Sequence, residues 1–188
     1  MSFNNAVSYV HTLLRGVVMP GDVVVDATVG NGFDTLFLAE RVAPAGLVLG
    51  FDIQEDSIRV TRGKTEQYAS IVRLFTIGHE DMLASIPTEH HGHITAVMFN
   101  LGYRPGGDKQ ITTTAGKTVA ALQQAMQLLK LGGVITVVVY SHPEGMRELA
   151  AVRDLFSGLP QTEFTVTESW FVNQQGMAPI VFAVCKHR

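Results

Sequence analysis

The sequence predicts an α/β fold in which a mostly parallel β-sheet carries helices on both faces. Short β-branched runs alternate with amphipathic stretches along most of the chain, as in successive βαβ units. The first run, at 23–27, passes through a glycine-containing turn directly into a helix at about 34–42. The last two strands, at 164–171 and 180–186, are joined without a helix, so we expect an antiparallel strand at the end of the sheet.

Size, charge and cysteine content limit the classes of protein that the chain can represent. With 188 residues, 46% of them apolar, the chain suits a single domain over 1–188. A net charge of −3 excludes a general polyanion-binding surface, so any nucleic acid must be contacted locally. Cys185 is the only cysteine, which excludes an intramolecular disulfide. Neither a signal peptide nor a membrane span is recognisable, and we expect a cytoplasmic protein.

The remaining elements follow from the same periodicities. The seven expected strands lie at 23–27, 47–53, 71–77, 94–99, 134–140, 164–171 and 180–186. The expected helices lie at 3–16, 34–42, 55–69, 81–85 and 114–130, with a last helix after Pro143. The first helix is expected to cover one edge of the sheet or, alternatively, to form a rim of the substrate site. Gly132-Gly133 is expected to end the helix at 114–130 as a C-cap.

The turn after the first strand has the character of a nucleotide-cofactor loop. Its glycines allow a tight turn, and the following helix offers free N–H groups, with Asp34 or Thr35 as the expected N-cap. A dinucleotide loop would have a third glycine where this chain has Thr35. Carboxylates suit the cationic end of S-adenosylmethionine better than a pyrophosphate, so the loop favours this cofactor over NAD. The candidate cofactor-binding residues of the loop are Asp26, Gly30, Asn31, Gly32, Asp34 and Thr35.

Two further strand ends carry candidate contacts with an adenosyl group. Asp52 lies twenty residues past Gly32, where an acidic side chain reaches the ribose hydroxyls of either cofactor, and Gln54 follows it. Alternatively, Asp52 caps the next helix. His79 and Glu80 follow the third strand, where they could bind adenine, or else cap a short helix with His79 at the surface.

The fourth strand ends in Asn100-Leu101-Gly102-Tyr103, where a doubly wound sheet gathers its chemistry. Asn100 can accept hydrogen bonds from a substrate amine, and Tyr103 can stack on a base. We therefore expect both to be catalytic, with Asn100 also next to the cofactor; the alternative is a plain turn. Arg104 and Lys109, in the loop that follows, are candidate substrate contacts.

The fifth strand ends near three further candidates. Tyr140 and His142 could face the substrate, although a histidine at a helix start is often only a neighbour of the cap. Arg147 could contact a phosphate. No cysteine or carboxylate near the histidines at 90–93 completes a ligand set with typical spacing, so we expect a solvated loop and no metal.

Several of these motifs together resemble a known family. The segments 26–35, 50–54, 78–80, 99–109 and 173–174 are similar to the small MnmM/YtqB-type class I methyltransferases, over nearly the whole chain. The resemblance implies a Rossmann-like fold, S-adenosylmethionine as cofactor and tRNA as partner. The cofactor positions that it implies are Asn31, Asp34, Asp52, Gln54, His79 and Glu80. Ser141 departs from the glycine that is more common there in the family.

The resemblance also implies a reaction, namely N-methylation of the 5-aminomethyl group of 5-aminomethyl-2-thiouridine at the anticodon wobble position. In this hypothesis Asn100 orients the amine, Tyr103 stacks on the base, and Arg104, Lys109 and Arg147 hold anticodon-loop phosphates. The alternatives are an rRNA methyltransferase, a small-molecule amine methyltransferase and a non-catalytic S-adenosylmethionine-binding RNA-associated protein. An NAD-dependent oxidoreductase would have only His142 as its acid or base. The apolar C-terminal strand is compatible with a homodimer.

Overall fold

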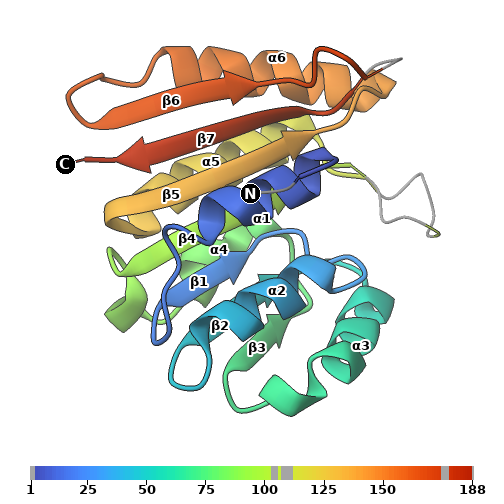
Figure 1. Ribbon diagram of the computed structural model, residues 1–188, viewed down its shortest axis with the longest axis vertical. Helices are drawn as coiled ribbons and strands as arrows, with labels where there is room; N and C mark the ends of the chain where they lie inside the picture. Colours follow the sequence, from blue (N-terminus) through green and yellow to red (C-terminus); the bar gives the residue numbers. More distant parts are fainter. Residues whose placement is uncertain (1–2, 103–105, 107–111, 175–177, 188) are drawn as a thin grey trace.

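A single seven-stranded sheet forms the centre of the molecule (Figure 1). The computed structural model describes residues 3–102, 106, 112–174 and 178–187. The strand order is β3-β2-β1-β4-β5-β7-β6. All neighbouring strands are parallel except β7, which runs antiparallel to both β5 and β6, so the predicted antiparallel C-terminal strand is confirmed. The strands are β1 (Val23–Asp26), β2 (Leu47–Phe51), β3 (Val72–Phe75), β4 (Ile94–Asn100), β5 (Leu129–Val139), β6 (Phe164–Ser169) and β7 (Ile180–Lys186).

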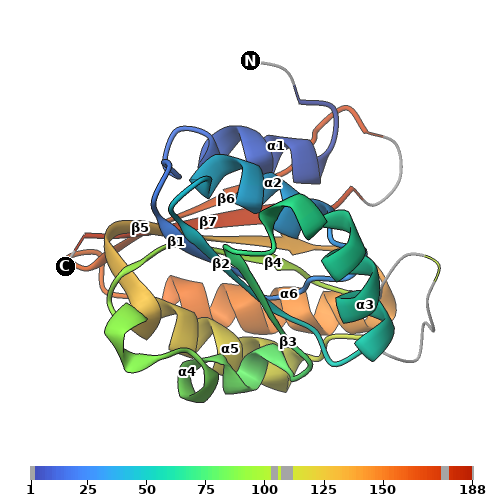
Figure 2. The ribbon, with the colours of Figure 1, turned by 90° about the horizontal axis from the view of Figure 1, so that it is seen from below.

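Helices cover both faces of this sheet, as predicted. In Figure 2, α1, α2 and α3 lie on one face and α4, α5 and α6 on the other. The α-helices are α1 (Ala6–Leu14), α2 (Phe33–Val42), α3 (Glu55–Lys64), α4 (Met82–Ser85), α5 (Ala115–Leu128) and α6 (Pro143–Ser157). Three short 3₁₀ segments are η1 (Glu66–Tyr68), η2 (His79–Asp81) and η3 (Thr88–His90). The single helix expected at 55–69 is thus divided into α3 and η1. No helix within the described ranges is long and apolar enough to cross a membrane.

The apolar core consists of two layers, one on each face of the sheet. Successive strand residues point to opposite faces, so Val24 packs in the layer of α1 and α2 while Val25 packs in the layer of α5 and α6. Because both faces are covered, the central strands are apolar at nearly every position. This burial holds the carboxyl ends of β1 and β4 next to each other, and the site lies there.

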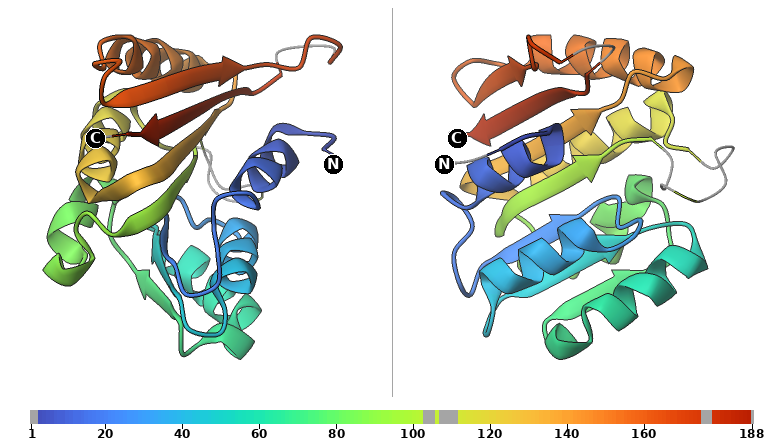
Figure 3. Two further views of the ribbon diagram at one scale, coloured as in Figure 1. Left: turned by 60° about the vertical axis from the view of Figure 1, so that its left-hand side comes forward. Right: turned by 45° about the vertical axis from the view of Figure 1, so that its right-hand side comes forward.

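The first helix lies across a face of the sheet, so the expectation that it covers an edge is wrong. Val10 and Leu14 of α1 are fully buried in the same layer as Ala96 of β4 and Val138 of β5. The two edges are instead formed by β3 and β6. Figure 3 shows α1 lying over the middle of the sheet. An apolar stripe on a helix reports that the helix is buried, but the tertiary fold decides where.

Two expected helix caps are also wrong. The N-cap position of α2 is Gly32, at φ 76°, and no side chain caps the helix, because the side chains of Asp34 and Thr35 bind other partners. At the other end of the fold, α5 ends at Leu128, and β5 begins at once. Gly133 therefore belongs to β5, in a bulge beside β4 where a Cβ atom would stand 3.0 Å from the Ile94 carbonyl oxygen.

The start of α6 depends on a glycine that touches the end of β5. A Cβ atom on Gly145 would stand 1.8 Å from the Tyr140 carbonyl oxygen, whereas one on Gly63 of α3 would meet nothing within 4 Å. We expect Gly145→Ala to lower the free energy of unfolding by about 1–3 kcal/mol through overpacking. Gly63→Ala should raise it by up to about 1 kcal/mol through helix propensity. Urea unfolding of both variants checks this, and equal effects would contradict the contact.

Candidate active site

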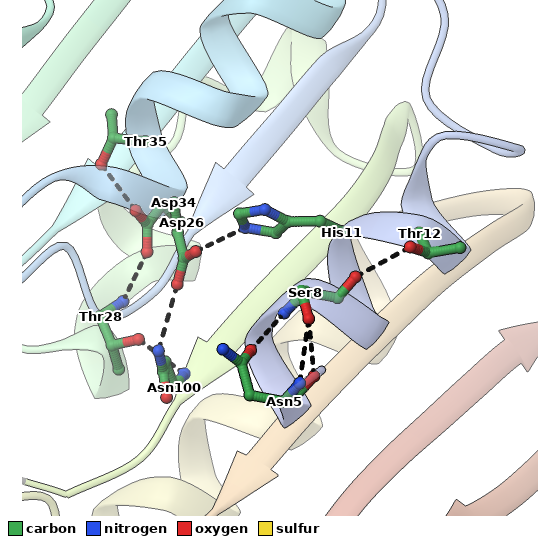
Figure 4. A network of polar contacts seen from close by, with 9 residues as sticks. All are labelled: Asn5, Ser8, His11, Thr12, Asp26, Thr28, Asp34, Thr35 and Asn100. Atoms are coloured by element: carbon green, nitrogen blue, oxygen red, sulfur yellow. Dashed lines mark hydrogen bonds and ion pairs between the residues drawn. The ribbon is translucent and has the colours of Figure 1, made fainter. Parts of the chain in front are cut away.

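The polar residues of the carboxyl edge gather at the switch point between β1 and β4. The chain leaves β1 toward β2 and β3 on one side and later returns through β4 to β5 on the other. Ligands of doubly wound sheets bind in the crevice that this reversal opens. Figure 4 shows the side chains that meet there, which come from α1, β1, the loop after β1, α2 and β4.

Asp26, at the end of β1, holds the glycine loop in place. Its carboxylate accepts hydrogen bonds from the Thr35 hydroxyl at 2.6 Å and from the Thr28 amide at 3.1 Å (Figure 4). Asp26 is 1% exposed. Burial, together with the nearby Asp34 and Asp52 carboxylates, raises its pKa to about 7, although both hydrogen bonds act in the opposite direction. The structure therefore places Asp26 and Thr35 inside the loop, as its internal support.

Asp34, in the first turn of α2, links three elements. Its Oδ1 atom lies 2.7 Å from Nε2 of His11 on α1, and its Oδ2 atom accepts a hydrogen bond from Nδ2 of Asn100 on β4 at 3.2 Å (Figure 4). The His11 ring stacks on Phe37, with ring centroids 3.8 Å apart. The Asn100 backbone amide donates to the Thr28 hydroxyl at 2.7 Å. The predicted residues Asp34 and Asn100 are thus brought together, and α1 belongs to the site.

Asp52, at the end of β2, is bound to the same glycine loop. Its two oxygens accept hydrogen bonds from the backbone amides of Gly30 and Gln54, each at 2.8 Å. The alternative that Asp52 caps the following helix is wrong, because Gln54 occupies the N-cap position of α3. A Cβ atom on Gly32 would stand 2.4 Å from the Thr61 hydroxyl, so this glycine is needed where the loop meets α3. Asn31, between the two glycines, is half-buried.

His79 and Glu80, at the end of β3, are both held by specific partners. His79 is buried, and its Nδ1 atom donates to the Ala27 carbonyl at 3.1 Å, so a surface position for this residue is wrong. Burial lowers the pKa of His79. Glu80 forms an ion pair with Lys117 of α5. Burial acts to raise the pKa of Glu80, but the Lys117 hydrogen bond and charge outweigh it and bring this pKa below its usual value.

The residues after β5 lie at the neighbouring strand end. The Tyr140 side chain interacts with the Asn100 amide, while burial and the Asp34 charge raise the Tyr140 pKa. His142 is itself the N-cap of α6, because its Nδ1 atom accepts a hydrogen bond from the Gly145 amide at 3.0 Å. A Cβ atom on Gly102 would stand 3.1 Å from Nε2 of His142, so this imidazole lies against the tip of β4. His142 is therefore next to the site.

Other expected substrate contacts have different outcomes. Arg147 is exposed on α6 and pairs with Glu144 at 3.1 Å. Tyr103, Arg104 and Lys109 lie outside the described residues. Gly102 and Thr113, which flank them in the chain, are bonded to each other: the Gly102 amide donates to the Thr113 hydroxyl at 2.8 Å, and the Gly102 carbonyl accepts from the Thr113 amide at 3.1 Å.

The histidines at 90–93 show no metal-binding arrangement. Within the part of the chain that the structure describes, no three histidine, cysteine or acidic side chains converge as a metal site would require. The Nε2 atom of His91 lies 3.0 Å from the Ile86 carbonyl oxygen.

Sequence reasoning missed three polar contacts of the site: those of His11, Thr28 and Lys117. In the sequence, His11 is one position of the apolar stripe Val7, Val10 and Leu14 of the helix expected at 3–16. A histidine within such a stripe is a signal that a polar partner is needed. Thr28 and Lys117 carry no comparable signal, because their partners are distant in the chain. Thr28 accepts from the backbone amide of Asn100, 72 residues away, and Lys117 pairs with Glu80, 37 residues away.

Fold and loop together define the class of protein. Three features are those of the class I S-adenosylmethionine-dependent methyltransferases: the sheet order, the antiparallel β7, and a loop without a dinucleotide fingerprint whose Gly30 amide binds Asp52. Residues 48–185 match the family described as "Putative rRNA methylase". The chain belongs to this family, and the cofactor is therefore S-adenosylmethionine rather than NAD.

Individual relatives support the same assignment. The chain is 36% identical over 192 residues to the chloroplastic tRNA (mnm(5)s(2)U34)-methyltransferase of Arabidopsis thaliana, covering 96% of this chain and 69% of that protein. The crystal structure of a protein from Clostridium thermocellum that is described as a "putative rRNA-methylase" superimposes with a TM-score of 0.93 at 40% identity. The match covers 99% of this chain and all of that one. SMU.1697c from Streptococcus mutans, solved in complex with SAH, has a TM-score of 0.86 at 31% identity, covering 98% and 99%.

The raised pKa of Asp26 makes folding depend on pH. Since the folded protein holds this proton up to about pH 7 and the unfolded chain releases it near 3.8, stability falls as pH rises between these values. The slope from this group is at most about 1.4 kcal/mol per pH unit. Urea unfolding at several pH values should show a steeper fall with pH in the wild type than in Asp26→Asn, because burial also raises the pKa of Glu148, which still contributes to the fall in the variant. Asp22→Asn is the control, because the pKa of Asp22 is lowered; a fall in Asp26→Asn as steep as in the wild type would contradict the assignment.

Proposed function

We propose that the protein is a tRNA methyltransferase that transfers a methyl group to the amine of 5-aminomethyl-2-thiouridine at the anticodon wobble position. The name of the Arabidopsis relative supports the substrate, and the alignment covers nearly all of this chain. The observation that carries the proposal is the His11–Asp34–Asn100 chain at the tip of β4, which holds an amide in one orientation beside the cofactor loop. A primary amine needs such an acceptor to direct its lone pair.

The residues present fit the cofactor. Gly30 and Gly32 have positive φ values, and the start of α2 has no side-chain cap, so backbone N–H groups remain available there. Asp52 is proposed to bind the ribose hydroxyls, and His79 and Glu80 the adenine. Asn31 and Asp34 are proposed to hold the methionine end, where a carboxylate favours its ammonium group. When bound, S-adenosylmethionine supplies an electrophilic methyl group.

Asn100 is the proposed orienting residue for the substrate amine. Its Nδ2 atom donates to Asp34, so the amide cannot turn over without losing this hydrogen bond, and Oδ1 is left as the atom that accepts from the amine. A free alkylamine has a pKa near ~10.4, and its charged form cannot attack the methyl group. The site must therefore favour the neutral amine, and the apolar residues behind the strand tips, such as Leu101 and Val139, disfavour the charge.

Several other features remain proposals. Tyr103 would stack on the base, and Arg104, Lys109 and Arg147 would contact anticodon-loop phosphates, with His142 beside the substrate. A cytoplasmic location and a homodimer stay predictions from the sequence.

Methyl transfer to tRNA tests the function directly. The purified protein and S-adenosylmethionine are added to tRNA from cells that lack this methylation, and the nucleosides are analysed by mass spectrometry. We expect 5-aminomethyl-2-thiouridine to gain one methyl group. Methyl transfer to ribosomal RNA alone would favour an rRNA methyltransferase, as the family is described. Transfer to a free amine without RNA would favour a small-molecule amine methyltransferase. Binding of cofactor and RNA without any transfer would favour a non-catalytic role.

The orienting role of Asn100 is tested by truncation. We expect Asn100→Ala to lower turnover about 100-fold, because the substrate amine would no longer be held in line with the methyl group that it attacks. The affinity for SAH, measured by calorimetry, should change less than turnover. Ser141→Ala, just after the next strand, is the matched control, because its hydroxyl makes a long contact, 3.5 Å, with the Ala178 carbonyl. Unchanged turnover in Asn100→Ala would exclude the role.

A further inference from the structure

The only tryptophan of the chain is exposed on the side of the sheet where the parallel strands have their carboxyl ends and where the site lies. Trp170 directly follows β6, and its side chain is 62% exposed; Val172, two residues on, is 85% exposed. An indole is among the largest apolar side chains, and folding usually buries most of it. A large planar side chain left in water next to a site suggests a flat partner.

The strand register places Trp170 relative to the site. Ser169 of β6 pairs with Val181 of β7, and Ile180 of β7 pairs with Val139 of β5, so Trp170 and Tyr140 follow strand ends on the same edge. In Figure 1 the arrows of β5 and β6 point to the same side. With strands about 4.8 Å apart, Trp170 lies roughly 10 Å from β5 and roughly 15 Å from β4 and Asn100. A short run of unpaired nucleotides can span this distance.

The residues on both sides of Trp170 contact the N-terminal part of the chain. The Ser169 hydroxyl lies 3.3 Å from the Tyr9 hydroxyl of α1. The Phe171 ring packs edge to face against Tyr9 and against Phe3, with centroid distances of 6.2 Å in each case. The exposed indole therefore stands on a support packed against α1, and little conformational freedom is lost when a partner binds.

The charges near this edge favour a base over a phosphate as the partner. Glu168 of β6, two residues before Trp170, pairs with Arg153 of α6, so this cation is not free to attract a phosphate. The chain as a whole carries a net charge of −3, so attraction to the phosphate backbone is weak. Stacking of a base on an aromatic ring supplies affinity without positive charge.

We propose that Trp170 is a stacking platform for an unpaired base of the RNA substrate. The target nucleotide occupies the site at Asn100 and Tyr140, and a nearby nucleotide of the same loop stacks on the indole. Single-stranded loops are recognised in this way, by splayed bases on aromatic side chains. The inference rests on the proposed RNA substrate and adds a contact outside the reacting centre.

The fluorescence of Trp170 tests the contact without any need for catalysis. Because the chain has one tryptophan, any change of indole emission reports on this residue alone. The protein with SAH bound is titrated with a synthetic anticodon stem-loop RNA and, separately, with a blunt RNA duplex of equal length. We expect saturable quenching by the stem-loop and none by the duplex. Equal quenching by both, or none by the stem-loop, would overturn the proposal.

Substitutions test the energetic weight of the platform. We expect Trp170→Ala to weaken stem-loop binding about 5- to 150-fold, the loss of one stacked base, as measured by anisotropy of labelled RNA. Trp170→Phe should retain most of the affinity. Leu131→Ala is the matched control, because Leu131 is 65% exposed near the start of β5, at the amino end of the strand and away from the site. SAH affinity and thermal stability should change little in all three variants.

The outcomes separate this proposal from the proposed function. If the wild type methylates tRNA while Trp170→Ala binds and reacts normally, the platform is excluded and the function stands. If the wild type binds no RNA at all, both are excluded. If Leu131→Ala weakens binding as much as Trp170→Ala, the effect is not specific to the indole, and the platform is again excluded.

Discussion

The arrangement of this site depends on two carboxylates at the start of α2 and the end of β1. Asp26 is buried and accepts from Thr28 and Thr35, which closes the glycine loop upon itself. Asp34 binds His11 with one oxygen and Asn100 with the other, which joins α1 to β4. The two carboxylates repel each other, and this repulsion adds to burial in raising the pKa of Asp26. A cation bound nearby would relieve the repulsion, as the ammonium group of S-adenosylmethionine can.

This constraint explains why an N-terminal helix belongs to a cofactor site formed by strand ends. The apolar stripe of α1 is buried on the sheet and carries His11 to Asp34. The other side of the same helix brings Tyr9 to Ser169, beside Trp170. One helix thus contacts both the candidate site, through Asp34, and the residue that precedes Trp170. A change in the packing of α1 would therefore be felt at both places.

Much of the fold could be predicted from the sequence, as could the cofactor and the edge of the sheet where the candidate site lies. The seven strands, the antiparallel β7 and the helices on both faces follow from patterning, and the rule that ligands bind at carboxyl strand ends led to Asp34, Asp52, His79 and Asn100. The errors concern places where a local signal competes with a distant partner. Asp34 and Thr35 have the chemistry of N-caps, but Asn100 and Asp26 bind their side chains instead. The glycines at 132–133 have the chemistry of a helix end, but they serve a strand bulge beside β4.

The sequence by itself determined the class of fold, the cofactor loop and the family resemblance, because periodicity and short motifs are local and survive in one dimension. Only the tertiary structure decided that α1 lies across a face, that His79 is buried against Ala27, and that His11 orients Asp34 and Asn100. The residues that these contacts join are 23 positions apart for His11 and Asp34, 52 for Ala27 and His79, and 66 for Asp34 and Asn100. No local pattern encodes such pairs, because they form only when separate layers of the core close around the sheet.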